Sequence, residues 1–100
     1  GAEPHPTGQV SASVECGFVI VDGTKYDDVP AHHCRIVEAL IVANGDYVTG
    51  PSLELLPGCR GKKISREIKS LEARIPGLTN YLRHEGNKGY RILKIVPDCP

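Results

Sequence analysis

The sequence predicts a small α+β domain in which a β-hairpin, three helices and a second β-hairpin follow one another. Asp22-Gly23, a pair favoured in tight hairpin turns, separates two runs suited to strands. Isoleucine and leucine recur with helical spacing between residues 60 and 75. A glycine-containing turn at 84–89 separates two further runs suited to strands. The length of 100 residues accommodates one domain of this kind.

The N-terminal residues differ in composition from the rest of the chain. Residues 1–12 are rich in proline, glycine and other small residues, which indicates a flexible arm ahead of a folded domain at 13–97. Residues 14–21 are mostly apolar and β-branched, so they predict the first strand. Thr24–Tyr26 are expected to form its hairpin partner.

The middle of the chain predicts two helices of unequal length. Residues 31–43 have apolar positions at helical spacing, with Pro30 suited to the start and the Asn-Gly pair at 44–45 suited to the end. Thr49 is expected to cap a second helix, which the Pro-Gly pair at 57–58 ends within two turns. A helix this short is stable only when it packs against other elements.

The third helix is expected to run from Arg60 or Gly61 to Ile75 and to have two different sides. One side is an apolar stripe of Ile64, Ile68, Leu71 and Ile75. The opposite side carries long cationic and small residues, namely Lys62, Arg66, Lys69 and Ala73, with Lys63 and Ser70 beside them. The third helix is therefore predicted to anchor on one side in the core and to present positive charge on the other.

The C-terminal part predicts a hairpin with a cationic tip. Residues 78–83 lead in, 84–89 turn, and 90–96 return. Tyr90 is expected to pack into the core at the base of this hairpin. The tip offers donors from Arg83, His84, Lys88 and Arg91.

Charge is divided unevenly along a chain whose formal net charge is zero. Residues 1–58 hold two basic residues against eight acidic ones, a net charge of −6. Residues 59–94 hold ten basic residues against three acidic ones, a net charge of +7, and Asp98 completes the balance. Such a cationic second half favours binding to a polyanion. The alternative interpretation is a solvated helix that happens to be basic.

Three helices followed by a β-hairpin is the plan of a winged helix-turn-helix domain. In that plan the third helix enters the major groove of double-stranded DNA, and the hairpin lies along the phosphate backbone as a wing. Long cationic side chains can reach base edges and phosphates, while small residues allow close approach. The candidate DNA-binding residues are Lys62, Lys63, Ser65, Arg66, Lys69, Ser70, Arg74, Arg83, Lys88 and Arg91.

Four segments carry a resemblance to a known family. They are FVIVDGTKYDDV (18–29), CRIVEALIVANGDYVT (34–49), ISREIKSLEARI (64–75) and GNKGYRIL (86–93). With these segments the chain resembles the OmpR/PhoB-type winged-helix effector domain of bacterial response regulators, over about residues 14–96. The resemblance implies a transcriptional regulator that binds DNA in the cytoplasm.

The chain departs from this family in two places. It has one clear N-terminal hairpin where the family has a four-stranded sheet, and its loop after the second helix is reduced to PGCRG (57–61). In the family that loop contacts RNA polymerase. A receiver domain is not contained in these residues, so regulation by phosphorylation does not follow from them.

Two other classes of function compete with DNA binding. A winged-helix protein-interaction module would bury the outer face of the third helix against a protein partner, or display apolar residues there. An enzyme would need a nucleophile, a base and an orienting group held together. Cys59 beside Arg60 is a candidate reactive thiol, but no partner base is apparent from the spacing, so no enzyme is predicted.

Cysteine and histidine do not predict a metal site or a cofactor. The cysteines at 16, 34, 59 and 99 lack C-x-x-C spacing, and the histidines at 5, 32, 33 and 84 form no zinc pattern with them. His32-His33-Cys34 resembles a ligand cluster, but neighbours on a helix point in different directions. Free buried thiols in a reducing cytoplasm are expected instead. No run approaches the about 18 apolar residues of a membrane span.

Overall fold

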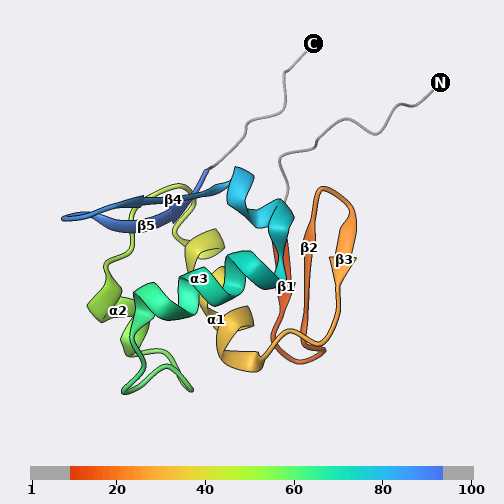
Figure 1. Ribbon diagram of the computed structural model, residues 1–100, viewed down its shortest axis with the longest axis horizontal. Helices are drawn as coiled ribbons and strands as arrows, with labels where there is room; N and C mark the ends of the chain where they lie inside the picture. The colour runs from red at the N-terminus through yellow and green to blue at the C-terminus, as the bar shows by residue number, and fades with distance from the viewer. Residues whose placement is uncertain (1–9, 94–100) are drawn as a thin grey trace, which may run out of the picture.

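The computed structural model describes residues 10–93, which form an α+β domain with three α-helices and two small antiparallel sheets (Figure 1). In chain order the elements are β1 (Val10–Ser13), β2 (Phe18–Val21), β3 (Thr24–Tyr26), α1 (Ala31–Val42), α2 (Gly50–Glu54), α3 (Ile64–Arg74), the 3-10 helix η1 (Pro76–Asn80), β4 (Leu82–Glu85) and β5 (Gly89–Ile92). The predicted α+β class is confirmed. Within residues 10–93 no helix is both long and apolar enough to cross a membrane.

The N-terminal sheet has three strands in the order β1-β2-β3, one more than the predicted hairpin. β1 lies within the stretch expected to be a flexible arm, so that prediction is wrong for residues 10–12, while residues 1–9 lie outside the described part. Residues 14–17 form a turn instead of the start of a strand, because the Gly17 N–H bonds the Ser13 carbonyl at 2.9 Å and folds β1 back onto β2. Asp22 and Gly23 form the predicted turn between β2 and β3.

The first two helices agree with the sequence to within one residue at most of their ends. α1 follows Pro30, and the chain leaves it through Asn44 and Gly45, both with positive φ. The Thr49 side chain accepts a hydrogen bond from the Ser52 N–H at 3.3 Å, which confirms Thr49 as the cap of α2. That side-chain oxygen satisfies one of the N–H groups that every helix start leaves without a partner.

α3 begins at Ile64, three to four residues later than predicted. Gly61 has a φ of +76°, a left-handed conformation that an α-helix cannot include. Lys62 therefore lies in the turn ahead of α3, and Lys63 occupies the N-cap position. The apolar stripe of the helix is as predicted, since Ile64, Ile68, Leu71 and Ile75 are all buried.

The second hairpin has a shorter turn than predicted and is joined by a further segment, while the predicted return strand at 94–96 lies outside the described residues. The lead-in at 76–80 is the 3-10 helix η1, which buries Leu78 completely, and β4 begins only at Leu82. β4 and β5 pair from Leu82 opposite Ile92 to Glu85 opposite Gly89. Val48, between α1 and α2, exchanges two backbone hydrogen bonds with Tyr90, at 2.7 and 2.8 Å. The segment that leads into α2 is thereby fixed against the part of β5 that follows the turn.

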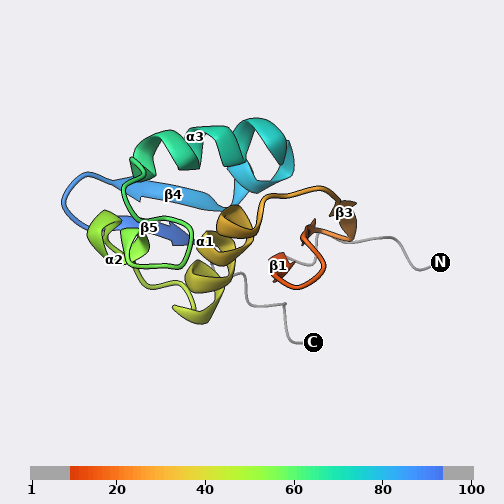
Figure 2. The same cartoon turned by 90° about the horizontal axis from the view of Figure 1, so that it is seen from below.

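The core lies around α1, which contacts β1 and β2 of one sheet and β5 of the other. α3 forms an outer layer beside α1 and contacts α2 and η1, as Figures 1 and 2 show. The largest aliphatic side chains without solvent contact come from β2, the three α-helices, η1 and the residue between α3 and η1: Val19, Ile36, Val37, Leu40, Leu53, Leu71, Ile75 and Leu78. Because α3 buries only one stripe, its opposite side remains free.

A hydrogen bond joins the two ends of the domain. The Tyr81 hydroxyl, just after η1, donates to both carboxylate oxygens of Asp22 at 2.6 Å. Asp22 belongs to the β2–β3 turn. The hydrogen bond, with burial and the charge of Asp22, raises the pKa of Tyr81 to about 12.

Replacing Tyr81 by phenylalanine is expected to lower the free energy of unfolding at pH 7 by about 1.5 kcal/mol, the low end for a bond to a charged group because Asp22 is exposed. The folded pKa lies above the ordinary value of 10.0, so this contribution is fully present below pH 10 and is lost as the pH rises toward about 12. Urea unfolding of both proteins at pH 7 and 11.5 checks this. A Tyr81→Phe variant whose deficit is the same at both pH values would contradict it.

Candidate functional site

The free side of α3 carries the side chains predicted to contact DNA. Ser65, Arg66, Lys69, Ser70 and Arg74 are all exposed, as are Lys62 and Lys63 just ahead of the helix. Figure 2 shows α3 along one edge of the molecule, with no other element covering its outer side. The structure therefore brings seven of the ten predicted residues onto one helix and the turn before it.

These cations are not neutralised by carboxylates. Within residues 10–93 the ion pairs are that of Lys25 with Asp27 and those of Glu67 with two histidines. Arg74 donates to the backbone carbonyl of Asp28 at 3.2 Å, a neutral partner. The outer face of α3 thus keeps its full positive charge.

The hairpin supplies the remaining predicted residues, with one difference. Arg83 and Lys88 are exposed, and Arg83 donates to the backbone carbonyls of Thr79 and Leu82 at 3.1 and 3.0 Å. Arg91 was predicted at the open tip, but it lies half-buried in β5 with its guanidinium 5.1 Å from the centre of the Tyr47 ring. The Lys88 ammonium lies over the same ring at 5.6 Å. Tyr47 thereby orders both cations by cation–π attraction.

Two views agree on how the hairpin lies relative to α3. Figures 1 and 2 both show the turn between β4 and β5 at the same end of the molecule as the first turn of α3. Tyr90 is buried as predicted, but it lies beside the turn and not at the base of the hairpin, where Leu82 pairs with Ile92. The His84 ring, opposite it on β4, stacks on it with centroids 4.4 Å apart. Burial raises the pKa of Tyr90, which keeps its hydroxyl neutral.

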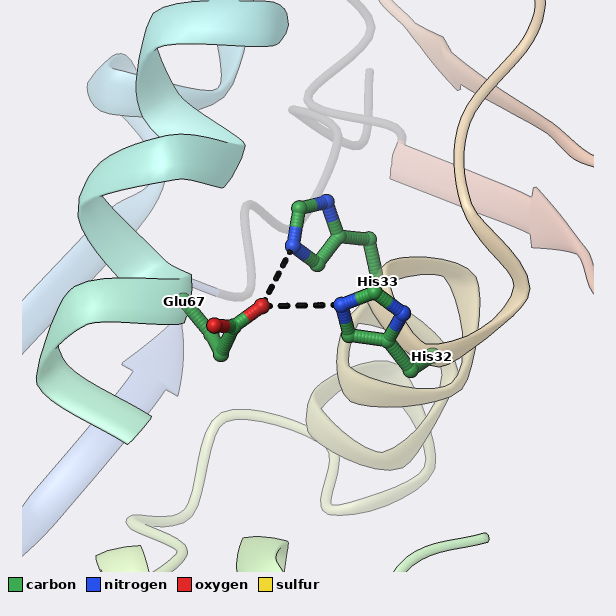
Figure 3. A group of neighbouring side chains, drawn as sticks. All are labelled: His32, His33 and Glu67. Carbon is green, nitrogen blue, oxygen red and sulfur yellow. Dashed lines mark hydrogen bonds and ion pairs between the residues drawn. The ribbon is translucent and has the colours of Figure 1, made fainter. Parts of the chain in front are cut away.

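A group of side chains that sequence reasoning set aside lies where α1 meets α3. The Nε2 atoms of His32 and His33 lie 2.8 and 3.0 Å from the same Glu67 carboxylate oxygen, Oε1 (Figure 3). The rings lie in the first turn of α1, tilted by 57° with centroids 4.3 Å apart. Neighbouring positions on a helix do diverge, but Glu67 approaches from another helix and meets both rings. Only the packing of α3 on α1 reveals this, and no local sequence pattern encodes it.

The electrostatics of this cluster follow from burial and hydrogen bonding. Desolvation by burial lowers the pKa of His33 despite its hydrogen bond to Glu67. Desolvation alone would raise the pKa of Glu67, but hydrogen bonds from His32 and His33, with their charge, outweigh it and lower that pKa. Glu67 is therefore an ionised carboxylate turned toward α1, away from the cationic face of its own helix.

The thiols divide into buried and exposed ones. Cys34 and Cys59 are buried and free, as predicted, and Cys16 is exposed, while Cys99 lies outside the described residues. Burial raises the pKa of the Cys59 thiol, and the charge of Glu67 adds to this against smaller effects of Lys62 and Arg35. The suggestion of a reactive Cys59 thiol beside Arg60 is therefore wrong, because desolvation outweighs the neighbouring cations.

Comparison with known proteins gives no match: no protein-family model, no curated protein and no solved structure corresponds to the chain. The resemblance to response-regulator effector domains stays a prediction from the sequence.

Proposed function

We propose that this domain is a winged-helix module that binds double-stranded DNA, as part of a bacterial transcriptional regulator. α3 is the recognition helix in the major groove, and the β4–β5 hairpin is the wing on the phosphate backbone. The observation that carries the proposal is the free face of α3, whose cations are exposed and unpaired. Of the two acids in the helix, Glu67 is turned inward to the histidines and Glu72 is half-buried.

The first turn of α3 is suited to a phosphate group. Lys63 occupies the N-cap position, and no side chain caps the helix there. Uncapped N–H groups and the positive end of the helix dipole attract anions. Lys62 and Lys63 add two exposed ammonium groups at the same place. This end of α3 would therefore fix the helix on the backbone at the edge of the groove.

The following two turns are suited to the floor of the groove. Arg66 and Lys69 are long exposed donors, and arginine or lysine on guanine is the commonest specific contact in the major groove. Ser70 and Ala73 are small and exposed on the same side, so they allow the helix to approach closely. The mixture of long donors and small residues is what a base-reading surface requires.

The wing would add contacts that do not depend on sequence. Arg83 and Lys88 are exposed on a hairpin whose turn lies at the same end as the start of α3. Each phosphate neutralised there adds a salt-dependent term to the affinity. The three-stranded sheet β1-β2-β3 also comes nearer to the four-stranded N-terminal sheet of the response-regulator family than the single hairpin expected from the sequence.

The competing proposal of a protein-interaction module makes a different demand on α3. It needs an apolar or covered outer face, whereas the outer face of α3 is exposed and cationic. The large apolar side chains with most exposure are Val42, at the end of α1, and Leu55, after α2. These positions lie outside α3, so they do not favour a protein partner at that face.

Replacing Arg66 or Lys69 by alanine is expected to weaken DNA binding five- to 150-fold if the residue reads a base, equivalent to about 1–3 kcal/mol. A phosphate contact such as that expected of Lys62 would instead lower the salt slope by about one. Fluorescence anisotropy with a labelled pool of random duplexes, at 50 and 200 mM salt, measures the salt slope. A duplex selected from that pool measures base specificity.

Lys25→Ala is the matched control, because Lys25 is an exposed cation on β3 that pairs with Asp27. It should leave affinity and salt slope unchanged. Unchanged binding in the Lys62, Arg66 and Lys69 variants would rule out α3 as the recognition helix.

A further inference from the structure

We propose that His32, His33 and Glu67 form a binding site for a divalent transition-metal cation, with Zn²⁺ as the representative ion. The three ligand atoms, one from each residue, lie within 4.8 Å of one another. Two of them come from the first turn of α1 and the third from the first turn of α3 (Figure 3). A bound ion would therefore join the two helices directly.

The ligand set matches the chemistry of such an ion. Two imidazoles and one carboxylate are a common set for zinc with three protein ligands, the fourth position being left to water. Imidazole nitrogen suits Zn²⁺, Cu²⁺ and Ni²⁺ better than Mg²⁺ or Ca²⁺, which prefer oxygen. The proposed selectivity is therefore for transition metals over the alkaline-earth ions.

The distances between the ligand atoms show what adjustment an ion would require. The Glu67 oxygen lies 2.8 Å from the His32 nitrogen and 3.0 Å from the His33 nitrogen. In a tetrahedral site with bonds of about 2.0 Å, neighbouring ligand atoms are about 3.3 Å apart. The Glu67 oxygen would move away from each nitrogen by a few tenths of an ångström as the ion replaces the protons between them. The two histidine nitrogens, which lie within 4.8 Å of each other, would have to settle at about the same 3.3 Å separation. His32 is the more exposed of the two imidazoles, so rotation of its side chain can supply this change.

The three side chains differ in exposure, so that one ligand is held in place and the other two can be reached from solvent. The His33 side chain is 3% exposed, so packing holds its ring in place. The side chains of His32 and Glu67 are 22% and 16% exposed, which leaves a way in for an ion and a water ligand. One fixed ligand and two adjustable ones are an arrangement that a metal ion can complete without unfolding its surroundings.

The hydrogen bonds of this cluster leave one buried nitrogen atom without a partner. One carboxylate oxygen accepts from both rings, while the Nδ1 atom of His33 is buried and has no partner among the described residues. The lack of a partner at Nδ1 is expected to limit the affinity, because a hydrogen bond at the outer nitrogen of a metal-bound histidine typically strengthens binding 10–100-fold. The proposed site is thus one of moderate, reversible affinity.

Metal binding by the full 100-residue chain tests the proposal. Isothermal titration with Zn²⁺, after treatment with chelator, should give one equivalent bound. Co²⁺ should develop the intense visible absorption of a four-coordinate ion. Free Zn²⁺ at about one hundred times its dissociation constant should raise the melting temperature by about 10 °C or more. Mg²⁺ at the same concentration should change neither signal.

Variants locate the site. Glu67→Gln and His32→Gln should each weaken Zn²⁺ binding at least tenfold and remove the Co²⁺ absorption. His84→Gln, an exposed histidine on β4 outside the cluster, should bind Zn²⁺ as the unchanged protein does. His32→Gln keeps the proposal testable if Glu67→Gln fails to fold, since His32 is the most exposed of the three.

The proposal is overturned if the folded protein binds no stoichiometric Zn²⁺, or if both cluster variants bind it like the unchanged protein. Equal weakening by His84→Gln would overturn it too, by assigning the ion to another place. In either case the cluster would be held by its hydrogen bonds alone. The variants would then differ from the unchanged protein in their free energy of unfolding, by an amount that is the same with and without chelator. None of these outcomes depends on whether α3 binds DNA.

Discussion

Replacing Gly89 by alanine is expected to lower the free energy of unfolding by about 3–5 kcal/mol, through backbone strain, a steric clash and lost backbone hydrogen bonds. Gly89 begins β5 with a φ of +105°, a conformation that side chains rarely adopt. A Cβ atom there would lie 2.1 Å from the Val48 carbonyl oxygen and 2.7 Å from the Thr49 Cα. Both neighbours are backbone atoms, so no side-chain rotation relieves the clash.

The clash acts on the backbone contact between Val48 and Tyr90, which holds the β4–β5 hairpin against the segment between α1 and α2. To make room, the chain must break the two hydrogen bonds between Val48 and Tyr90. Those bonds fix the hairpin against the segment that leads into α2. Tyr90, which is buried, would lose its position as well. The expected loss is therefore shared between the hairpin and the core beside it.

Gly86→Ala is the matched control in the same hairpin. A Cβ at Gly86 would meet no atom within 4 Å, and this residue does not have the positive φ of Gly89. Urea unfolding followed by circular dichroism should give Gly86→Ala a midpoint close to that of the unchanged protein. Equal stability of the two variants would mean that Val48 does not approach Gly89 as described.

The two glycines also illustrate what the sequence can and cannot predict. Gly86 and Gly89 both lie in the stretch 84–89, for which the sequence predicts a turn. That turn is present, but only Gly89 is required by contact with another segment. Val48 lies 41 positions earlier, and its pairing with Tyr90 leaves no trace in local composition. Local conformation was predictable here, and the contact across the fold was not.

The same division holds for the strands and helices. The Asp22-Gly23 turn and the apolar stripe of α3 follow from neighbouring residues, and both were predicted. β1, with the sequence VSAS, has little strand propensity of its own and exists because β2 pairs with it. α3 begins later than the predicted Arg60 or Gly61 because the left-handed backbone of Gly61 cannot belong to an α-helix. Tertiary pairing and one backbone angle decided these boundaries.

The candidate DNA-binding site was more predictable than the histidine cluster. Exposed cations on one helix follow from the helical period, so their placement opposite the apolar stripe could be derived from residues 64–75 alone. The meeting of His32 and His33 with Glu67 needs the angle and spacing between α1 and α3. Those depend on the whole core, which no local pattern specifies.

Replacing Ile68 by alanine is expected to lower the free energy of unfolding by about 2–5 kcal/mol, the usual range for truncating a buried isoleucine. Ile68 is 5% exposed and lies in the middle of the stripe that α3 packs into the core. The cavity left behind cannot fill easily, because Leu71 and Ile75 beside it are themselves fully buried. Denaturant unfolding measures the loss.

Lys69→Ala is the control that separates the two sides of α3. Lys69 follows Ile68 directly but is exposed, so its replacement should change stability by no more than about 0.5 kcal/mol. If α3 is the recognition helix, the two sides of the helix should have the opposite effects on DNA binding. Lys69→Ala should weaken DNA binding. Ile68→Val lowers the free energy of unfolding by only about 0.5–1.5 kcal/mol, so the domain stays folded and its DNA binding should be unchanged. Loss of DNA affinity in Ile68→Val without loss in Lys69→Ala would mean that DNA binding depends on the packing of α3 rather than on its outer face.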